Sequence, residues 1–163
     1  MRYCTQARGS ALWHSMPAAP TDPTGRLAFV ATGAFGMAVV DTRRFNNPIV
    51  LGQLDLPGDA TDIAYDRVND VVIVASNAGG LHFVDVSDPM TPTLLRTARF
   101  QASRVETTLG VAYASSGRFL RAFDVRVGQF LARTNNAGSR LYRLSDRRGV
   151  PLQHRLRNAL EKL

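Results

Sequence analysis

A motif that recurs along the chain constrains its fold more than any other feature. The three copies are GGLHFVDVSDPMTPTLL at residues 79–95, FGMAVVDTRRFNNPIVL at residues 35–51, and a weaker GRFLRAFDVRVGQFL at residues 117–131. The aspartates that anchor the copies are 44 and 39 residues apart: Asp41, Asp85 and Asp124. A period of about 40 residues that is filled with short strands is typical of β-propeller blades.

Each copy contains runs of β-branched and aromatic residues bounded by Gly, Pro, Asn and Asp, and such runs predict strands separated by turns. The predicted strands are 27–31, 37–40 and 49–54 in the first copy, 60–65, 71–75, 81–84 and 93–97 in the second, and 104–109, 111–114, 119–123 and 129–132 in the third. Four strands per repeat suit a propeller blade. Most of the strands are apolar on both faces, which favours blades packed face to face. A parallel β-helix is the lower-ranked rival, because its repeats are usually about half this length.

The predicted fold class is therefore all-β, with about three four-stranded blades that form an incomplete ring. We place the blades at about 21–55, 56–99 and 100–135, within a repeat region of 21–149 that has an extra strand at 138–145. Residues 1–20 show no periodic pattern and are expected to be irregular. A closed propeller usually has at least four blades. The chain is thus either part of a longer propeller, which we favour, or one of two copies that complete a ring.

The last segment, residues 150–163, changes character. Pro151 can begin a helix. Leucines then recur at three- and four-residue spacing among polar residues, at Leu152, Leu156, Leu160 and Leu163. This pattern predicts a short C-terminal amphipathic helix.

The second copy resembles the LVIVD-repeat β-propeller family. The resemblance rests on residues 80–89, which end at Pro89, and on Pro92. The upstream segments 56–58, 62–64 and 71–75 match the rest of the repeat in the same order. The resemblance implies a non-catalytic module for protein–protein or surface-ligand binding, at an extracellular or cell-surface location.

The other two copies match the family less well. The first copy keeps Gly36, Asp41 and Pro48, but has Thr42-Arg43-Arg44 where the family shows a Val-Ser-Asx turn. The third copy keeps little beyond Phe123-Asp124-Val125. Residues 22–30 also resemble turn-plus-strand segments of lactonase-like propellers, so a portion of a propeller hydrolase is the alternative function.

The repeated positions are expected to be structural rather than catalytic. A recurrent aspartate after a strand most often accepts backbone N–H bonds in the following turn, and a ring of carboxylates around a cation is the functional alternative. The structural repeat positions are Asp41, Asp85, Asp124, Gly36, Gly80, Pro48 and Pro89. We expect no catalytic, cofactor-binding or metal-binding residue.

The histidines and the cysteine point to no particular chemistry. His14, His82 and His154 lie 68 and 72 residues apart, which is not a zinc-ligand spacing. Cys4 is the one cysteine and has no histidine near it in sequence that would activate it. The chain contains no Gly-x-Ser-x-Gly nucleophile elbow and no apolar run of the length that a membrane span requires.

The charge is unevenly distributed. Residues 1–95 carry a net charge of −3 and residues 96–163 a net charge of +10, with arginines densest between residues 140 and 157. Such asymmetry can mark contact with nucleic acid or an anionic surface. We nevertheless expect no nucleic-acid binding, because arginine is the general basic residue of the chain and no aromatic residues interleave for base stacking. An Arg-rich anion or nucleic-acid binder is the second alternative. The expected partner is a protein, or a second copy that associates through open blade faces.

Overall fold

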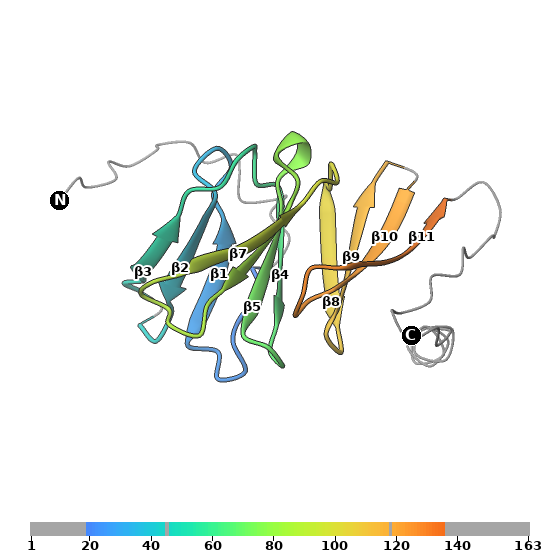
Figure 1. Cartoon of the computed structure of the whole chain (residues 1–163). Helices are drawn as coiled ribbons and strands as arrows, with labels where there is room; N and C mark the ends of the chain where they lie inside the picture. The colour runs from blue at the N-terminus through green and yellow to red at the C-terminus, as the bar shows by residue number, and fades with distance from the viewer. Residues whose placement is uncertain (1–18, 45, 118, 136–163) are drawn as a thin grey trace.

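The computed structural model describes residues 19–44, 46–117 and 119–135, and it shows three antiparallel sheets in chain order (Figure 1). Blade 1 consists of β1 (Leu27–Ala31), β2 (Met37–Asp41) and β3 (Ile49–Leu54). Blade 2 consists of β4 (Asp62–Asp66), β5 (Val71–Ala75), β6 (Leu81–Asp85) and β7 (Thr93–Ala98). Blade 3 consists of β8 (Arg104–Thr108), β9 (Val111–Ser116), β10 (Phe119–Asp124) and β11 (Phe130–Asn135). The prediction of an all-β fold with propeller-like blades is confirmed.

Blades 2 and 3 have four strands each, whereas blade 1 has three within the described residues. A single antiparallel bridge between Thr21 and Ala28 stands beside β1, at the place of a fourth strand. The only helical element among the described residues is one 3₁₀ turn, η1 (Asn77–Gly79). The predicted strand at 138–145, the predicted helix at 150–163 and almost all of the segment 1–20 lie outside the described residues.

Several strands begin or end a few residues away from the prediction, and hydrogen bonds explain two of these differences. β4 begins at Asp62 rather than at residue 60, because the Ala60 N–H instead donates to the Gly33 carbonyl of blade 1, 3.0 Å away. β11 continues to Asn135 rather than ending at residue 132, because it pairs with β10 up to Phe119.

Blades 1 and 2 repeat with a constant offset. The first residue of each blade 1 strand has its counterpart 44 residues later: Leu27 and Val71, Met37 and Leu81, Ile49 and Thr93. A register shift of the β-bulge kind recurs at equivalent places in all three sheets: Val39/Val40, Phe83/Val84 and Ala122/Phe123. Because a bulge increases local twist, each blade bends in the same way before its outermost strand.

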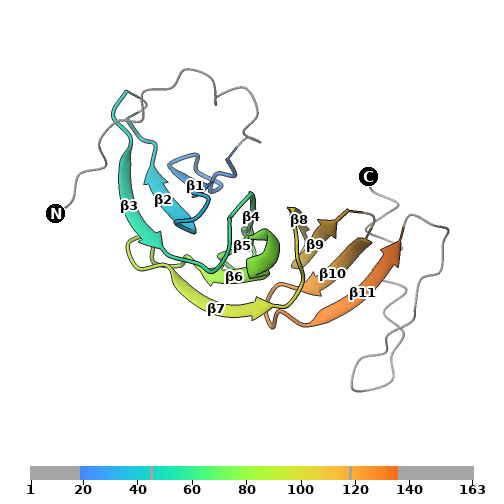
Figure 2. The ribbon, with the colours of Figure 1, turned by 90° about the horizontal axis from the view of Figure 1, so that it is seen from above.

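The blades fan out around one side, with β3, β7 and β11 along the outside of the arc (Figure 2). β4 lies against β8 on the inside. The Asp62 carboxylate accepts a 2.8 Å hydrogen bond from the Val105 N–H, and the Thr107 hydroxyl donates to the Tyr65 carbonyl at 3.0 Å. These bonds join the innermost strands of neighbouring blades, so the arc is one packed unit.

Blades 1 and 2 share an apolar core. Phe29, Met37 and Val39 of blade 1 pack toward Val72, Val74 and Val84 of blade 2, and all six side chains are fully buried. We call the side of a blade that points to the next blade its leading face, and the opposite side its trailing face. Fully burying one such side chain stabilises the fold by roughly 1.5–3 kcal/mol.

A second core joins the leading face of blade 2 to the trailing face of blade 3. Val71, Ile73 and Phe83 pack toward Ala112 and Phe123. The Phe83 and Phe123 rings meet edge to face with centroids 6.3 Å apart, an arrangement that aromatic quadrupoles favour. Blade 2 is thus covered on both faces, by blade 1 on its trailing face and by blade 3 on its leading face, and both of its faces are apolar.

Candidate binding site

Each of the three repeated aspartates holds the turn that follows its strand. Asp41, Asp85 and Asp124 accept a 2.9 Å bond at Oδ1 from the backbone N–H two residues later. The three carboxylates end β2, β6 and β10, which belong to three separate sheets. Each is therefore used locally in its own blade.

The residue after each aspartate ties two turns of its blade together. The Thr42 N–H donates to the Arg26 carbonyl at 2.8 Å, and the Val86 N–H donates to the Asp70 carbonyl at 2.9 Å. In blade 3 the Val125 N–H donates to the Gly110 carbonyl at 3.0 Å. The turns that carry Asp41, Asp85 and Asp124 thus occupy equivalent places in the three blades.

The repeated glycines stand where no larger residue fits. Gly36 has φ +77°, and a Cβ atom there would lie 2.2 Å from the Leu54 carbonyl oxygen. Gly80 has φ +109° and a similar approach to the Ala98 carbonyl. The repeated prolines are less constrained, since Pro48 is exposed and Pro89 is half-buried in its turn.

His82 is a buried titratable residue whose contacts the sequence does not indicate. Its imidazole contacts the Pro57 carbonyl and the Thr97 hydroxyl, and its side chain is fully buried. Burial lowers the pKa of His82 below its ordinary value, although the bond to Pro57 opposes this shift. The residue is thus a neutral bridge between β6, β7 and the connection from blade 1.

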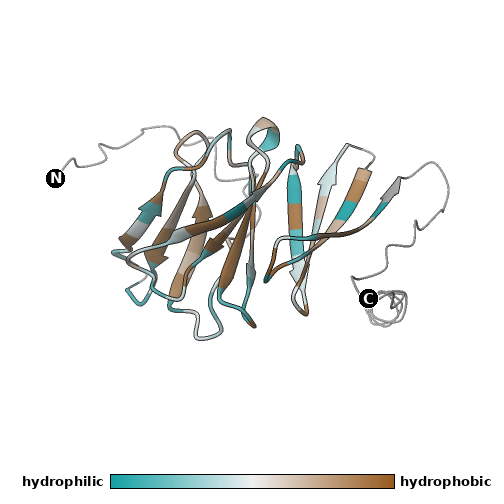
Figure 3. Ribbon diagram, in the orientation of Figure 1, coloured by the Kyte–Doolittle hydropathy of each residue, from teal (hydrophilic) through white to brown (hydrophobic). Residues whose placement is uncertain are grey.

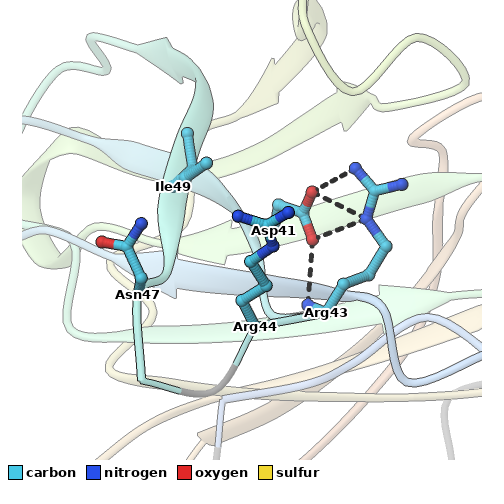
Figure 4. A pocket seen from close by; sticks show the side chains of 5 residues that line it. All are labelled: Asp41, Arg43, Arg44, Asn47 and Ile49. Carbon is cyan, nitrogen blue, oxygen red and sulfur yellow. Dashed lines mark hydrogen bonds and ion pairs between the residues drawn. The ribbon is translucent and has the colours of Figure 1, made fainter.

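A pocket of about 520 Å³ opens at the turn between β2 and β3 (Figure 4). The volume lies within the range of small-ligand sites. Two guanidinium groups, a carboxylate, an amide and an aliphatic side chain line it: Arg43, Arg44, Asp41, Asn47 and Ile49. The pocket therefore combines a net positive charge with one apolar wall.

Asp41 and Arg43 form an ion pair within this pocket. The Arg43 Nε lies 3.0 Å from Oδ1 and 2.8 Å from Oδ2 of Asp41, and Nη2 pairs with Oδ2. These side-chain bonds, with the backbone bond from Arg43, hold the pKa of the Asp41 carboxyl below its usual range. Asp41 therefore stays ionised and neutralises Arg43 rather than Arg44.

The two end faces of the arc differ in polarity. Register pairing places Ala28 opposite Val40 and Val30 opposite Ala38, so β1 and β2 present apolar side chains on the trailing face of blade 1, where Gln53 of β3 is the polar neighbour of Ala38. On the leading face of blade 3, Tyr113 pairs with Ala122 and with Glu106, and Leu120 pairs with Ser115. The hydropathy colouring shows the same trend, since the strands of blades 1 and 2 are browner than those of blade 3 (Figure 3).

Other kinds of site find no support among the residues that the structure describes. Within them, no three His, Cys, Asp or Glu side chains are grouped as a metal ion would require. No helix in the described part of the chain is long and apolar enough to cross a membrane. Cys4 and the arginines between residues 140 and 157 lie outside that part.

Comparison with solved structures shows the same fold class. Sqt1 of Chaetomium thermophilum bound to the N-terminus of ribosomal protein L10 is similar with a TM-score of 0.60 and 16% identity, over 72% of this chain and 33% of that one. The nidogen/laminin complex gives a TM-score of 0.56 and 14% identity, over 75% and 48%. The WD40 β-propeller domain of Doa1 gives 0.52 and 11%, over 72% and 39%.

The chain thus has a β-propeller-type fold and spans between 33% and 48% of the length of these three structures. No protein-family model matches the chain, and no curated protein sequence matches it.

The sequence alone does not indicate the pocket. Arg43 and Arg44 were visible only as a departure from the turn of the second copy. The sequence signal for the pocket is the spacing of Asp41 and Arg43, which lie two residues apart and form an ion pair. Because Asp41 is engaged by Arg43, Arg44 is left without the carboxylate nearest to it in the sequence.

Proposed function

We propose that the chain is a non-catalytic binding module of the LVIVD-repeat propeller type, and that it works as part of a larger ring. The proposal rests mainly on the two end faces, against which no further blade packs among the described residues. Inside the arc, paired faces bury their side chains fully, as at Val72 and Val74. At the ends, Val30, Val40 and Tyr113 occupy face positions and are only half-buried.

An apolar face that lacks a neighbour favours association. Covering half-exposed side chains removes apolar area from water, which is worth about 25 cal/mol per Å². Terminal repeats that stay unpaired usually have a polar outer surface. The trailing face of blade 1 carries no charged residue at Ala28, Val30, Ala38 and Val40, so it has the composition of a face that is covered.

The solved neighbours support a binding role. One of them, the Chaetomium Sqt1 structure, holds the N-terminus of ribosomal protein L10. The limited share of each neighbour that the chain spans supports a requirement for further blades. A second copy of the chain can supply them in the isolated protein.

The test is the molar mass of residues 1–163 in solution, measured by size-exclusion chromatography with light scattering. We expect a mass of at least twice the 17.8 kDa of one chain. Val30→Glu places a charge on the trailing face of blade 1 and should return the protein to a monomer, because burying an unpaired charge is costly. Val68→Glu, in the exposed β4–β5 turn, is the matched control and should leave the mass unchanged. A wild-type monomer at every concentration would contradict the proposal.

A further inference from the structure

The turn between β2 and β3 differs from its counterpart in blade 2 at one position that matters for binding. Arg44 and Asp88 are 44 residues apart and occupy the same place in the repeat. The Asp88 carboxylate holds its own turn, accepting bonds from the Met90 N–H at 3.0 Å and the Thr91 hydroxyl at 2.7 Å. An arginine cannot accept such bonds.

The backbone of the blade 1 turn is nevertheless held in the same way. The Asn47 N–H donates to the Arg44 carbonyl at 2.8 Å, as the Thr91 N–H donates to the Asp88 carbonyl at 3.2 Å. The side chain at position 44 is therefore not needed for the turn. It has been released from the structural task that Asp88 performs.

Arg44 also lacks a carboxylate partner among the described residues. The nearest acidic group in the pocket, Asp41, is engaged by the backbone N–H and the guanidinium of Arg43. Figure 4 shows the two arginine side chains on either side of Asp41, with Asn47 and Ile49 on the flank. The pocket thus presents one uncompensated guanidinium, one amide and one aliphatic wall.

We propose that this pocket binds a carboxylate side chain of an acidic, partly apolar segment of a protein partner. The Arg44 guanidinium pairs with the carboxylate through two parallel N–H···O bonds, a geometry that arginine favours. Asn47 supplies an amide donor. Ile49, which is 52% exposed, contacts the apolar side chain that lies next to the carboxylate in the bound segment. The site rests on the proposed function, since it names the partner chemistry of a protein-binding module.

The apolar wall decides between two sources of the same charge. A free phosphate ion could also pair with Arg44, but it is hydrated on all sides and gains nothing from Ile49, the exposed aliphatic side chain that lines the pocket. A peptide that alternates acidic and aliphatic residues uses both features of the pocket. The observations therefore favour a protein segment over a small anion.

The test uses a short fluorescein-labelled peptide in which glutamate alternates with leucine, titrated with residues 1–163 and followed by fluorescence anisotropy. We expect saturable binding that weakens between about 0.05 M and 0.5 M NaCl, because exposed charges are screened. Arg44→Ala should weaken binding about tenfold or more, the loss expected for a charged hydrogen-bonded pair. Arg44→Lys should recover part of it. Arg67→Ala, which removes an exposed arginine outside the pocket, should leave the affinity unchanged.

Four results would overturn the assignment. They are a peptide that does not bind, equal affinity for a peptide with glutamine in place of glutamate, equal losses from Arg44→Ala and Arg67→Ala, and phosphate that competes as well as the unlabelled acidic peptide. The light-scattering experiment separates this site from the wider proposal. If end-face association persists while the peptide fails to bind, the pocket assignment fails alone.

Discussion

The Nε2 atom of His82 lies 3.0 Å from the carbonyl oxygen of Pro57, on the connection that leads from blade 1 into blade 2. A carbonyl can only accept, so Nε2 carries the proton, and Nδ1 accepts from the Thr97 hydroxyl at 2.9 Å. The connection passes close to η1, since a Cβ atom on Gly79 would lie 1.8 Å from the Pro57 oxygen. One buried imidazole thus fixes how the chain crosses between the first two blades.

The buried imidazole predicts that stability falls in mild acid. Burial holds the pKa of His82 below 6.5, the value expected in the unfolded chain, so acid protonates the unfolded chain first. The free energy of unfolding is therefore highest above about pH 6.5 and decreases as the pH falls, by up to about 1.4 kcal/mol per pH unit. Urea unfolding at several pH values measures the slope.

His82→Gln is the matched variant for this prediction. Its amide can still donate to Pro57 but does not titrate, so the slope should shrink relative to wild type. A variant with the same pH dependence as wild type would show that other groups cause it.

The glycines of blade 1 predict a contrast between two equivalent substitutions. Gly36 and Gly25 both have positive φ, at +77° and +67°, so alanine costs about 1 kcal/mol at either position. Only at Gly36 would the new Cβ meet backbone, 2.2 Å from the Leu54 oxygen, whereas Gly25 has nothing within 4 Å. Gly36→Ala should therefore cost about 1–3 kcal/mol more than Gly25→Ala in chemical denaturation. Equal costs would indicate that the β3 end is not packed against this turn.

The contact between the outer strand of one blade and the turn of the next predicts energetic coupling. Arg96 on β7 approaches Gly128 of blade 3, where a Cβ atom would lie 2.7 Å from the Arg96 Cδ. In the preceding pair, Gly52, 44 residues before Arg96, meets the turn that contains Pro89. In each contact a glycine faces a larger residue: Gly52 of β3 meets the turn with Pro89, and Gly128 of the blade 3 turn meets Arg96 of β7.

A double-mutant cycle tests this relationship. Gly128→Ala should destabilise the protein by about 1 kcal/mol more in the wild-type background than in Arg96→Ala, because the shortened side chain leaves room. Additive effects would contradict the predicted exchange of volume.

The turn aspartates predict a modest and specific loss. Asp85→Ala removes the acceptor of the Ser87 N–H and should reduce the free energy of unfolding by about 1 kcal/mol, the usual net value of one hydrogen bond. Asp85→Asn keeps an acceptor oxygen and should lose less. Thermal unfolding of the two variants distinguishes them, and equal losses would mean that the charge of Asp85, not its hydrogen bond to the Ser87 N–H, stabilises the turn.

The features that the sequence predicts correctly are those with a local or periodic origin. The strands of blade 2 alternate side chains toward two neighbouring blades, and the copy 44 residues upstream repeats them, so the sheets could be predicted. His82 is different, because its partner Pro57 lies 25 residues away and no spacing indicates the contact. The pocket also escaped prediction, since it depends on which guanidinium Asp41 engages.

Hydrogen exchange of residues 1–163 at low and high protein concentration tests the central claim most directly, namely that no blade of the described residues covers either end face of the arc. At low concentration we expect the slowest exchange in β5 and β6, which are covered on both sides, and faster exchange in β1, β2, β9 and β10. At high concentration, protection should rise in blades 1 and 3 and stay constant in blade 2. Uniform protection of the three blades at low concentration, or a change confined to blade 2, would contradict the account.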